Sequence, residues 1–135
     1  MAEGKNVVRG PIRSHKDMEV FQMAMDTAMD VFWITRKFPR EEVYSLTSQM
    51  LRSSRSVASN FVEAWRKRRY EGAFISKLSD AETEAAETQV HITFAVKCGY
   101  LSRAEGAEIY RRYERILRTL VGMIANADRW LIRMK

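Results

Sequence analysis

The feature that most constrains the fold of this chain is a helical apolar repeat, which recurs in four successive segments joined by short connections. In each segment, apolar residues return every three or four positions, which places them on one face of an α-helix. No segment sustains the alternation of apolar and polar residues that predicts a β-strand. Short connections make neighbouring helices antiparallel, so the pattern predicts an all-α, antiparallel up-and-down four-helix bundle.

The expected domain organisation is an N-terminal tail followed by one bundle. Residues 1–15 show no periodicity, and we expect them to form a flexible tail that includes His15. The bundle covers residues 16–135, and its helices are expected at about 17–37, 42–68, 72–98 and 103–133. Pro39 should limit the first helix, and Gly99 is a suitable residue to end the third. Ser102, with Glu105 three residues later, predicts a capping box at the start of the fourth.

The fourth segment has the most regular repeat. Its apolar residues are spaced alternately by three and four, as in a heptad repeat. The expected core positions are Tyr110, Tyr113, Leu117, Leu120, Ile124, Ala127, Leu131 and Met134. The first segment instead has more apolar surface than one buried face needs, including Met23, Met25, Met29, Phe32 and Trp33. Trp65 and Trp130 add aromatic area near helix ends. Surplus apolar area usually marks an interface, so we expect a homo-oligomer.

Hydropathy and cysteine content bear on the cellular compartment. The chain of 135 residues is 46% hydrophobic and has no run of 18 apolar residues, so we expect no transmembrane helix. The N-terminus lacks the apolar core of a secretory signal. Cys98, the single cysteine, fits a reducing compartment. These features predict a cytoplasmic protein without a membrane role.

Residues able to perform catalysis are scarce. His15 lies in the expected tail, and His91 follows Glu87 by one helical turn, but a di-metal bundle needs further histidines and glutamates. The glycines form no phosphate-binding loop. Cys98 has no histidine partner nearby in the sequence, and we expect it to be a small buried filler. We therefore expect no enzyme activity, no metal and no cofactor.

Charge is the most informative functional signal. Lys and Arg total 23 against 17 Asp and Glu, a net charge of +6, and the isoelectric point is about 9.7. Arginine outnumbers lysine, and its planar guanidinium suits phosphate. The second and fourth segments are basic, whereas the third is acidic. The candidate nucleic-acid-binding residues are Arg52, Arg55, Arg66, Lys67, Arg68, Arg69, Arg111, Arg112, Arg115 and Arg118.

Three interpretations of this basic surface stay open. It binds the phosphates of DNA or RNA, releasing counterions. Alternatively, the arginines pair with the acidic third helix of a neighbouring subunit, through Glu82, Glu84 and Glu87. In the third interpretation they form a solvated face. Base-specific recognition is not indicated, because the chain has no helix-turn-helix or zinc-finger signature.

Five short motifs, in order along the chain, carry a family resemblance. They are Asp17–Ala24 (DMEVFQMA), Phe38–Gln49 (FPREEVYSLTSQ), Ser56–Ala64 (SVASNFVEA), Glu84–Gln89 (EAAETQ) and Gly99–Leu101 (GYL). Together they resemble the four-helix-bundle proteins encoded in 23S rRNA intervening sequences, over residues of about 15–133. The resemblance implies a left-handed up-and-down bundle that assembles into a homopentamer. A related branch serves as the accessory subunit of diversity-generating retroelements and binds a reverse transcriptase and nucleic acid.

The sequence departs from the family pattern in the second helix. Asn60 and Glu63 match, but Ala64 and Arg66 occupy positions where glycines are usual, and Ala58 replaces a proline. These changes should make the helix straighter and more continuous. The added charge of Arg66–Arg69 favours the branch that binds nucleic acid. We therefore expect a non-catalytic, oligomeric accessory protein that binds nucleic acid, with a reverse transcriptase as one partner. The alternative is a protein-interaction scaffold that uses its basic surface for an acidic partner.

Overall fold

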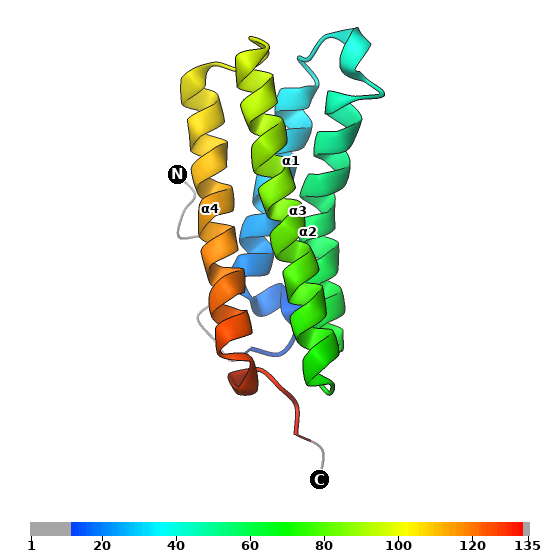
Figure 1. Ribbon diagram of the computed structural model, residues 1–135, viewed down its shortest axis with the longest axis vertical. Coiled ribbons are helices and arrows are strands. Elements are labelled where there is room, and N and C mark those ends of the chain that lie inside the picture. Colours follow the sequence, from blue (N-terminus) through cyan, green and yellow to red (C-terminus); the bar gives the residue numbers. More distant parts are fainter. Residues whose placement is uncertain (1–11, 134–135) are drawn as a thin grey trace.

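The computed structural model describes residues 12–133 and confirms the all-α four-helix bundle (Figure 1). Its helices are α1 (Glu19–Thr35), α2 (Leu46–Arg66), α3 (Glu71–Lys97) and α4 (Arg103–Ala125). Within residues 12–133, three short 3₁₀ helices accompany them: η2 (His15–Asp17), η3 (Arg40–Glu42) and η4 (Ala127–Arg129). No strand occurs within residues 12–133.

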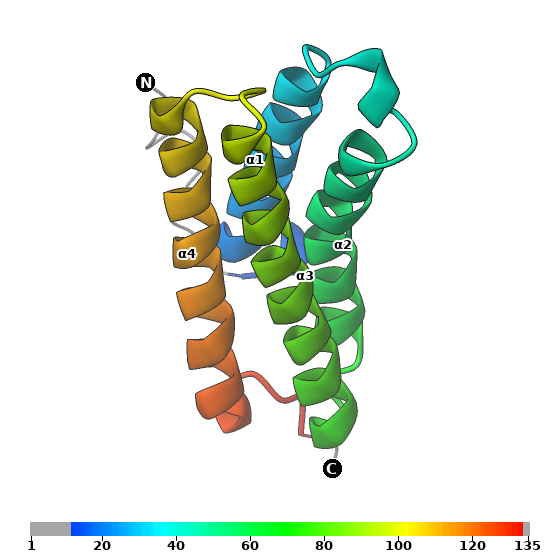
Figure 2. The same ribbon diagram turned by 45° about the horizontal axis from the view of Figure 1, so that its top comes forward.

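The four helices run alternately up and down, and α3 packs against both α2 and α4 (Figures 1 and 2). The α1 helix closes the bundle by packing against α2 and α4. The α2 and α4 helices therefore occupy diagonal positions. This arrangement matters for function, because the basic residues of the sequence are concentrated on these two helices.

The cores of α2 and α3 follow the sequence repeat. The residues that recur every three or four positions along these two helices are buried: Leu46, Met50, Ser53, Ser54, Val57, Phe61 and Ala64 on α2, and Phe74, Leu78, Ala81, Ala85, Thr88, Ile92 and Ala95 on α3. The buried hydroxyls of Ser53 and Thr88 lie 2.7 Å apart, and Thr88 also donates to the carbonyl oxygen of Glu84 at 2.8 Å. Small side chains allow α2 and α3 to approach closely while these polar atoms remain satisfied.

The core of α4 differs from the expected register. Its buried residues are Gly106, Ile109, Tyr113, Ile116, Leu120 and Met123, with Ala127 in η4. Tyr110 is 41% exposed, and Leu117 and Ile124 are only partly buried against the edge of the core. The expected repeat and the observed one share Tyr113, Leu120 and Ala127. The packing of Gly106 against Val96 of α3 favours the observed repeat. Met134, an expected core residue, lies outside the described residues.

The start of α4 and the end of α3 confirm the expected signals. The Ser102 hydroxyl accepts from the Glu105 N–H at 3.0 Å, and the Glu105 carboxylate accepts from the Ser102 N–H at 3.0 Å. Gly99 has a φ of 82°, a left-handed conformation that favours glycine. The Tyr100 N–H then donates to the carbonyl oxygen of Ala95 at 2.8 Å. These contacts end α3 at Lys97 and begin α4 at Arg103.

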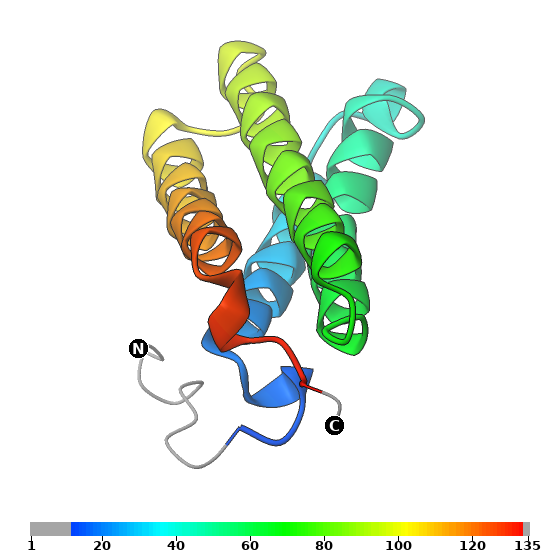
Figure 3. The same ribbon diagram turned by 60° about the horizontal axis from the view of Figure 1, so that its bottom comes forward.

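The fourth helix ends at Ala125 rather than near residue 133. The Asn126 side chain donates to the carbonyl oxygen of Gly122 at 3.0 Å, and the chain then turns through η4 beneath the bundle (Figure 3). This turn brings the ring of Trp130 to 6.1 Å from that of Trp65, which is itself buried. Both tryptophans therefore pack within one chain instead of adding to an exposed surface.

Two other expectations about single residues were wrong. Cys98 is exposed at the C-cap of α3 and does not fill the core, because α3 ends there and turns into the Gly99 loop. His15 is not part of a flexible tail: Ser14 and Asp17 form a capping box around η2, and the His15 ring lies edge-on to Phe21 with 4.9 Å between centroids. Residues 1–11 of the expected tail lie outside the described residues.

Candidate nucleic-acid interface

The ten basic candidates divide between diagonal helices. Arg52 and Arg55 lie on α2, and the cluster from Arg66 to Arg69 lies at its C-terminal end, in the connection to α3. The other four are on α4, which packs against α1 and α3. The structure therefore does not bring the candidates together into one patch. Each has to be judged by its local contacts.

Arg52 is engaged by the acidic helix of its own chain. Its guanidinium contacts Glu84 at 3.3 Å and Glu87 at 3.2 Å, both on α3. The acidic helix α3 thus pairs with an arginine of its own chain, across the α2–α3 contact. The Arg52 side chain is exposed, so these ion pairs contribute little stability. They do offset its charge.

Two arginines of α4 also have carboxylate partners. Arg112 pairs with Asp30 of α1, and its side chain is only 25% exposed, so it links the two helices. Arg111 pairs with Glu108 one turn earlier at 3.0 Å, and both of these side chains are exposed. An exposed pair of this kind exchanges readily with solvent. Arg111 thus stays accessible to an anion, whereas Arg112 is held against α1.

Arg68 has a structural role. Its guanidinium lies 3.7 Å from the centroid of the Trp65 ring, and its Nε donates to the Trp65 carbonyl oxygen at 2.9 Å. The Arg68 carbonyl oxygen accepts from the Ile132 N–H at 3.0 Å, which ties the segment after α4 to the end of α2. Partial burial, with a smaller contribution from Arg66, lowers the pKa of Arg68. Through these contacts Arg68 holds the Trp65 side chain and the end of α2 in place.

Six candidates are exposed and form no ion pair with any residue of 12–133: Arg55, Arg66, Lys67, Arg69, Arg115 and Arg118. We call Arg66, Lys67 and Arg69 the α2-end cluster. We call Arg111, Arg115 and Arg118 the α4 stripe, because spacings of four and three place them on one face of the helix. These two groups are the accessible positive surfaces that the candidates form.

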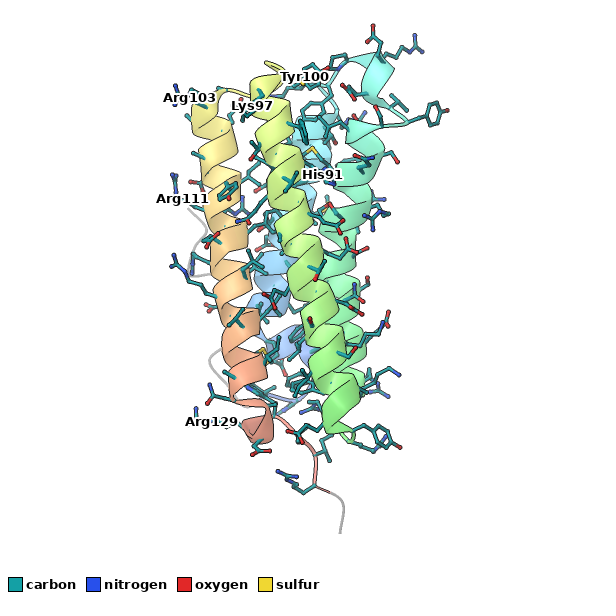
Figure 4. All side chains as sticks on the ribbon, in the orientation of Figure 1. His91, Lys97, Tyr100, Arg103, Arg111 and Arg129 are labelled. Atoms are coloured by element: carbon teal, nitrogen blue, oxygen red, sulfur yellow. The ribbon has the colours of Figure 1, made fainter. Side chains whose placement is uncertain are left out.

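A hollow of about 600 Å³ lies between α3 and α4, and only one of its lining residues, Arg111, is among the candidates predicted from the sequence. Its floor is largely apolar, and Lys97, Arg103 and Arg111 supply positive charge around it. Figure 4 shows Lys97 and Arg103 at the same end of the bundle, with Arg111 farther along α4. Tyr110 also lines the hollow. The hollow could have been predicted from the alternative apolar repeat of α4, through Gly106, Ile109 and Tyr113, because this repeat leaves Tyr110 outside the core.

Potential metal ligands are scattered over the described part of the chain. Within 12–133, no group of three or more His, Cys, Asp or Glu side chains is placed to hold an ion. His91 is half-buried on α3, and burial lowers its pKa, while the nearby Glu87 acts in the opposite direction. No described helix is long and apolar enough to cross a membrane.

Fold and surface together define a small all-α bundle with accessible cations on its α2 end and on α4. Residues 16–122 match the sequence profile of the 23S rRNA-intervening sequence proteins, and the chain belongs to this family. The solved structures include a similar bundle, the 1.70 Å crystal structure of a protein of unknown function from the S23 ribosomal protein family of Bacteroides thetaiotaomicron. It is 24% identical, with a TM-score of 0.72, and the match covers 78% of this chain and 95% of that one. This likeness concerns the fold alone. A comparison with curated proteins found no match.

Proposed function

We propose that this protein is a non-catalytic, oligomeric accessory protein that binds the phosphates of DNA or RNA. The observation that supports the proposal is the set of exposed cations in the α2-end cluster and the α4 stripe, of which only Arg111 has a carboxylate partner within residues 12–133, the exposed Glu108. A cation that already has a protein partner loses that partner when it binds phosphate, whereas Arg115 and Arg118 lose none. Binding would release counterions and depend little on base sequence.

The test is binding of single- and double-stranded DNA and RNA across a salt series. Each phosphate contact contributes roughly 0.7 to 0.9 to the slope of log affinity against log salt. Changing Arg111, Arg115 and Arg118 together to Gln should lower the slope by about two to three, and weaken all sequences about equally. The same expectation holds for Arg66, Lys67 and Arg69 changed together, which tests the second surface separately.

Arg52→Gln is the matched control, because Arg52 is an exposed arginine whose charge Glu84 and Glu87 already offset. It should leave the salt slope nearly unchanged. The proposal fails if the wild-type protein binds no nucleic acid at low salt. It also fails if both triple variants keep their fold and the wild-type slope.

A second candidate function is a protein-interaction scaffold, which the exposed apolar side chains of α1 favour. Met25, Met29 and Trp33 are 44%, 49% and 58% exposed. Met25 and Met29 also line a hollow of about 310 Å³ between α1 and α2, beside Arg55. We call Met25, Met29 and Trp33 the exposed strip of α1, and exposed apolar surface of this kind usually marks a protein interface. We propose that the protein forms a homo-oligomer. That the oligomer is a pentamer, and that a reverse transcriptase is a further partner, rests on the family resemblance.

Pull-down of a reverse transcriptase by the wild-type protein and by Trp33→Glu tests whether the reverse transcriptase is a partner.

A further inference from the structure

The hollow between α3 and α4 combines an aromatic ring, an apolar floor and three cations. Ile92 and Val96 of α3 and Ala107 of α4 contribute apolar surface. Tyr110 stands at the wall with 41% of its surface exposed, although its neighbours Ile109 and Tyr113 are buried. A volume of about 600 Å³ is within the range of small-molecule sites. The hollow is thus large enough for a planar ring.

Gly106 helps to form this hollow. A Cβ atom at Gly106 would lie 2.3 Å from Cγ2 of Val96, so only glycine allows α3 and α4 to come this close. One turn further along α4, the Tyr110 carbonyl oxygen accepts from Nε2 of Gln89 at 3.3 Å, and Gln89 also donates to Glu114 at 2.9 Å. These contacts fix the position of the α4 backbone at Tyr110 relative to α3.

The charges around the hollow favour an anion. Lys97 and Arg103 form no ion pair with any residue of 12–133, and Arg111 has only the exposed Glu108 as a partner. Arg103 and Arg111 are two turns apart on α4, about 12 Å along its axis. Arg111 also begins the α4 stripe, so the hollow and the proposed phosphate surface are continuous. The occupant that this combination fits has a flat apolar ring and more than one negative charge.

We propose that the α3–α4 hollow binds an unpaired nucleotide of a single-stranded nucleic acid, with its base stacked on Tyr110 and its neighbouring phosphates at Lys97, Arg103 and Arg111. The proposal rests on the proposed nucleic-acid binding and adds a preference for single strands. A duplex keeps its bases stacked inside and can engage only the cations. Stacking on an aromatic side chain is available to every base, so the preference for single strands needs no particular sequence.

The experiment compares single-stranded and duplex oligonucleotides of about ten nucleotides, by fluorescence anisotropy over a salt series. Tyr110→Ala should weaken single-strand binding about tenfold at every salt concentration. The duplex affinity and both salt slopes should stay unchanged, because the substitution removes no charge. Tyr110→Phe keeps the ring and should retain wild-type affinity. Lys97→Gln with Arg103→Gln should lower the single-strand slope by about 1.4.

Tyr44→Ala is the matched control, since Tyr44 is 95% exposed and does not line the hollow. The helical circular-dichroism signal of each variant shows that the fold is retained. If Tyr110→Ala weakens both forms equally, or neither, this proposal is overturned while the phosphate surface stands. If the wild-type protein binds neither form at low salt, the proposed function itself fails. A different result would overturn the proposal in favour of an apolar acid as the occupant of the hollow. In that result a fatty acid displaces the single strand from the protein, and Tyr110→Phe and Tyr110→Ala bind the single strand with the same affinity.

Discussion

At the residue scale, a small polar network joins the two connections at one end of the bundle. The Tyr100 hydroxyl donates to the Glu42 carboxylate at 2.7 Å, and Glu42 also accepts from the Ser45 hydroxyl at 2.7 Å and the Leu46 N–H at 3.2 Å. Glu42 follows α1, whereas Tyr100 follows α3, so these bonds tie together turns far apart in the chain. Hydrogen bonds from Ser45, Tyr100 and Leu46 lower the pKa of Glu42, and the bond to Glu42 raises the pKa of Tyr100 to about 12.

We predict that Tyr100→Phe lowers thermal stability at neutral pH and shifts the pKa of Glu42 upward, because one bond to its charged form is lost. The folded-state pKa of Glu42 is depressed, so its contribution is present above its ordinary value of 4.5 and is lost as pH falls through the folded value. The difference in Tm between the two proteins should therefore shrink in acid. Tm measured against pH checks this, with Tyr44→Phe as the control.

At high pH the same bond acts through Tyr100. Its folded-state pKa is raised, so its contribution is present below its ordinary value of 10 and is lost as pH rises through about 12. Titration of tyrosinate absorbance should show a group that titrates near 12 and is missing in Tyr100→Phe, whereas Tyr113, whose pKa is also raised by burial, should titrate late in both proteins. If the group that disappears in Tyr100→Phe titrates near the ordinary value of 10 instead, the bond does not persist in solution.

At the element scale, the register of α4 decides which apolar side chains stabilise the bundle. Ile116 and Leu120 are fully buried, whereas Leu117 is only partly buried against the edge of the core. We predict that Ile116→Ala or Leu120→Ala costs about 2–5 kcal/mol of unfolding free energy, and that Leu117→Ala costs clearly less. Arg118→Ala, on the exposed face, should change it little. Denaturant melts check the order, and a larger loss at Leu117 than at Ile116 would restore the register expected from the sequence.

The contact between α3 and α4 gives a second prediction at this scale. A Cβ at Gly122 has nothing within 4 Å, whereas one at Gly106 would collide with Val96, a β-branched residue with a stiff χ1. Gly122→Ala should therefore raise the unfolding free energy by roughly 0.5–1 kcal/mol, through the greater helix propensity of alanine. Gly106→Ala should lower it, because overpacking typically costs about 1–3 kcal/mol. Opposite signs of the two changes in thermal melts are the expected result.

At the scale of the whole molecule, the exposed strip of α1 predicts self-association. The chain has a mass of 15.7 kDa, and light scattering at micromolar concentration should give a multiple of it. Trp33 is the most exposed large side chain of the strip, so Trp33→Glu should shift the assembly toward the monomer by placing a charge in the interface. Tyr44→Glu, at an even more exposed aromatic residue off the strip, should leave the mass unchanged. A wild-type monomer would contradict the prediction.

The fold class, the number of helices and the cores of α2 and α3 all followed from the sequence alone. The physical reason is that each of these helices has one apolar repeat, and a bundle offers one place to bury it. The capping box at Ser102 and the left-handed Gly99 were also predictable, because end signals depend on local backbone chemistry. The charge of the basic segments was evident as well, since it requires only counting.

Contacts between distant residues required the tertiary structure. Two apolar registers of α4 were compatible with the sequence, and the close approach of Gly106 to Val96 separates them. The chain turns after the end of α4 at Ala125, and Trp130 then packs against Trp65, a contact that no local pattern indicates. Likewise, the pairing of Arg52 with Glu84 and the stacking of Arg68 on Trp65 divide similar arginines into engaged and accessible ones. Charge is a property of a residue type, but its availability depends on which neighbours the fold places within reach.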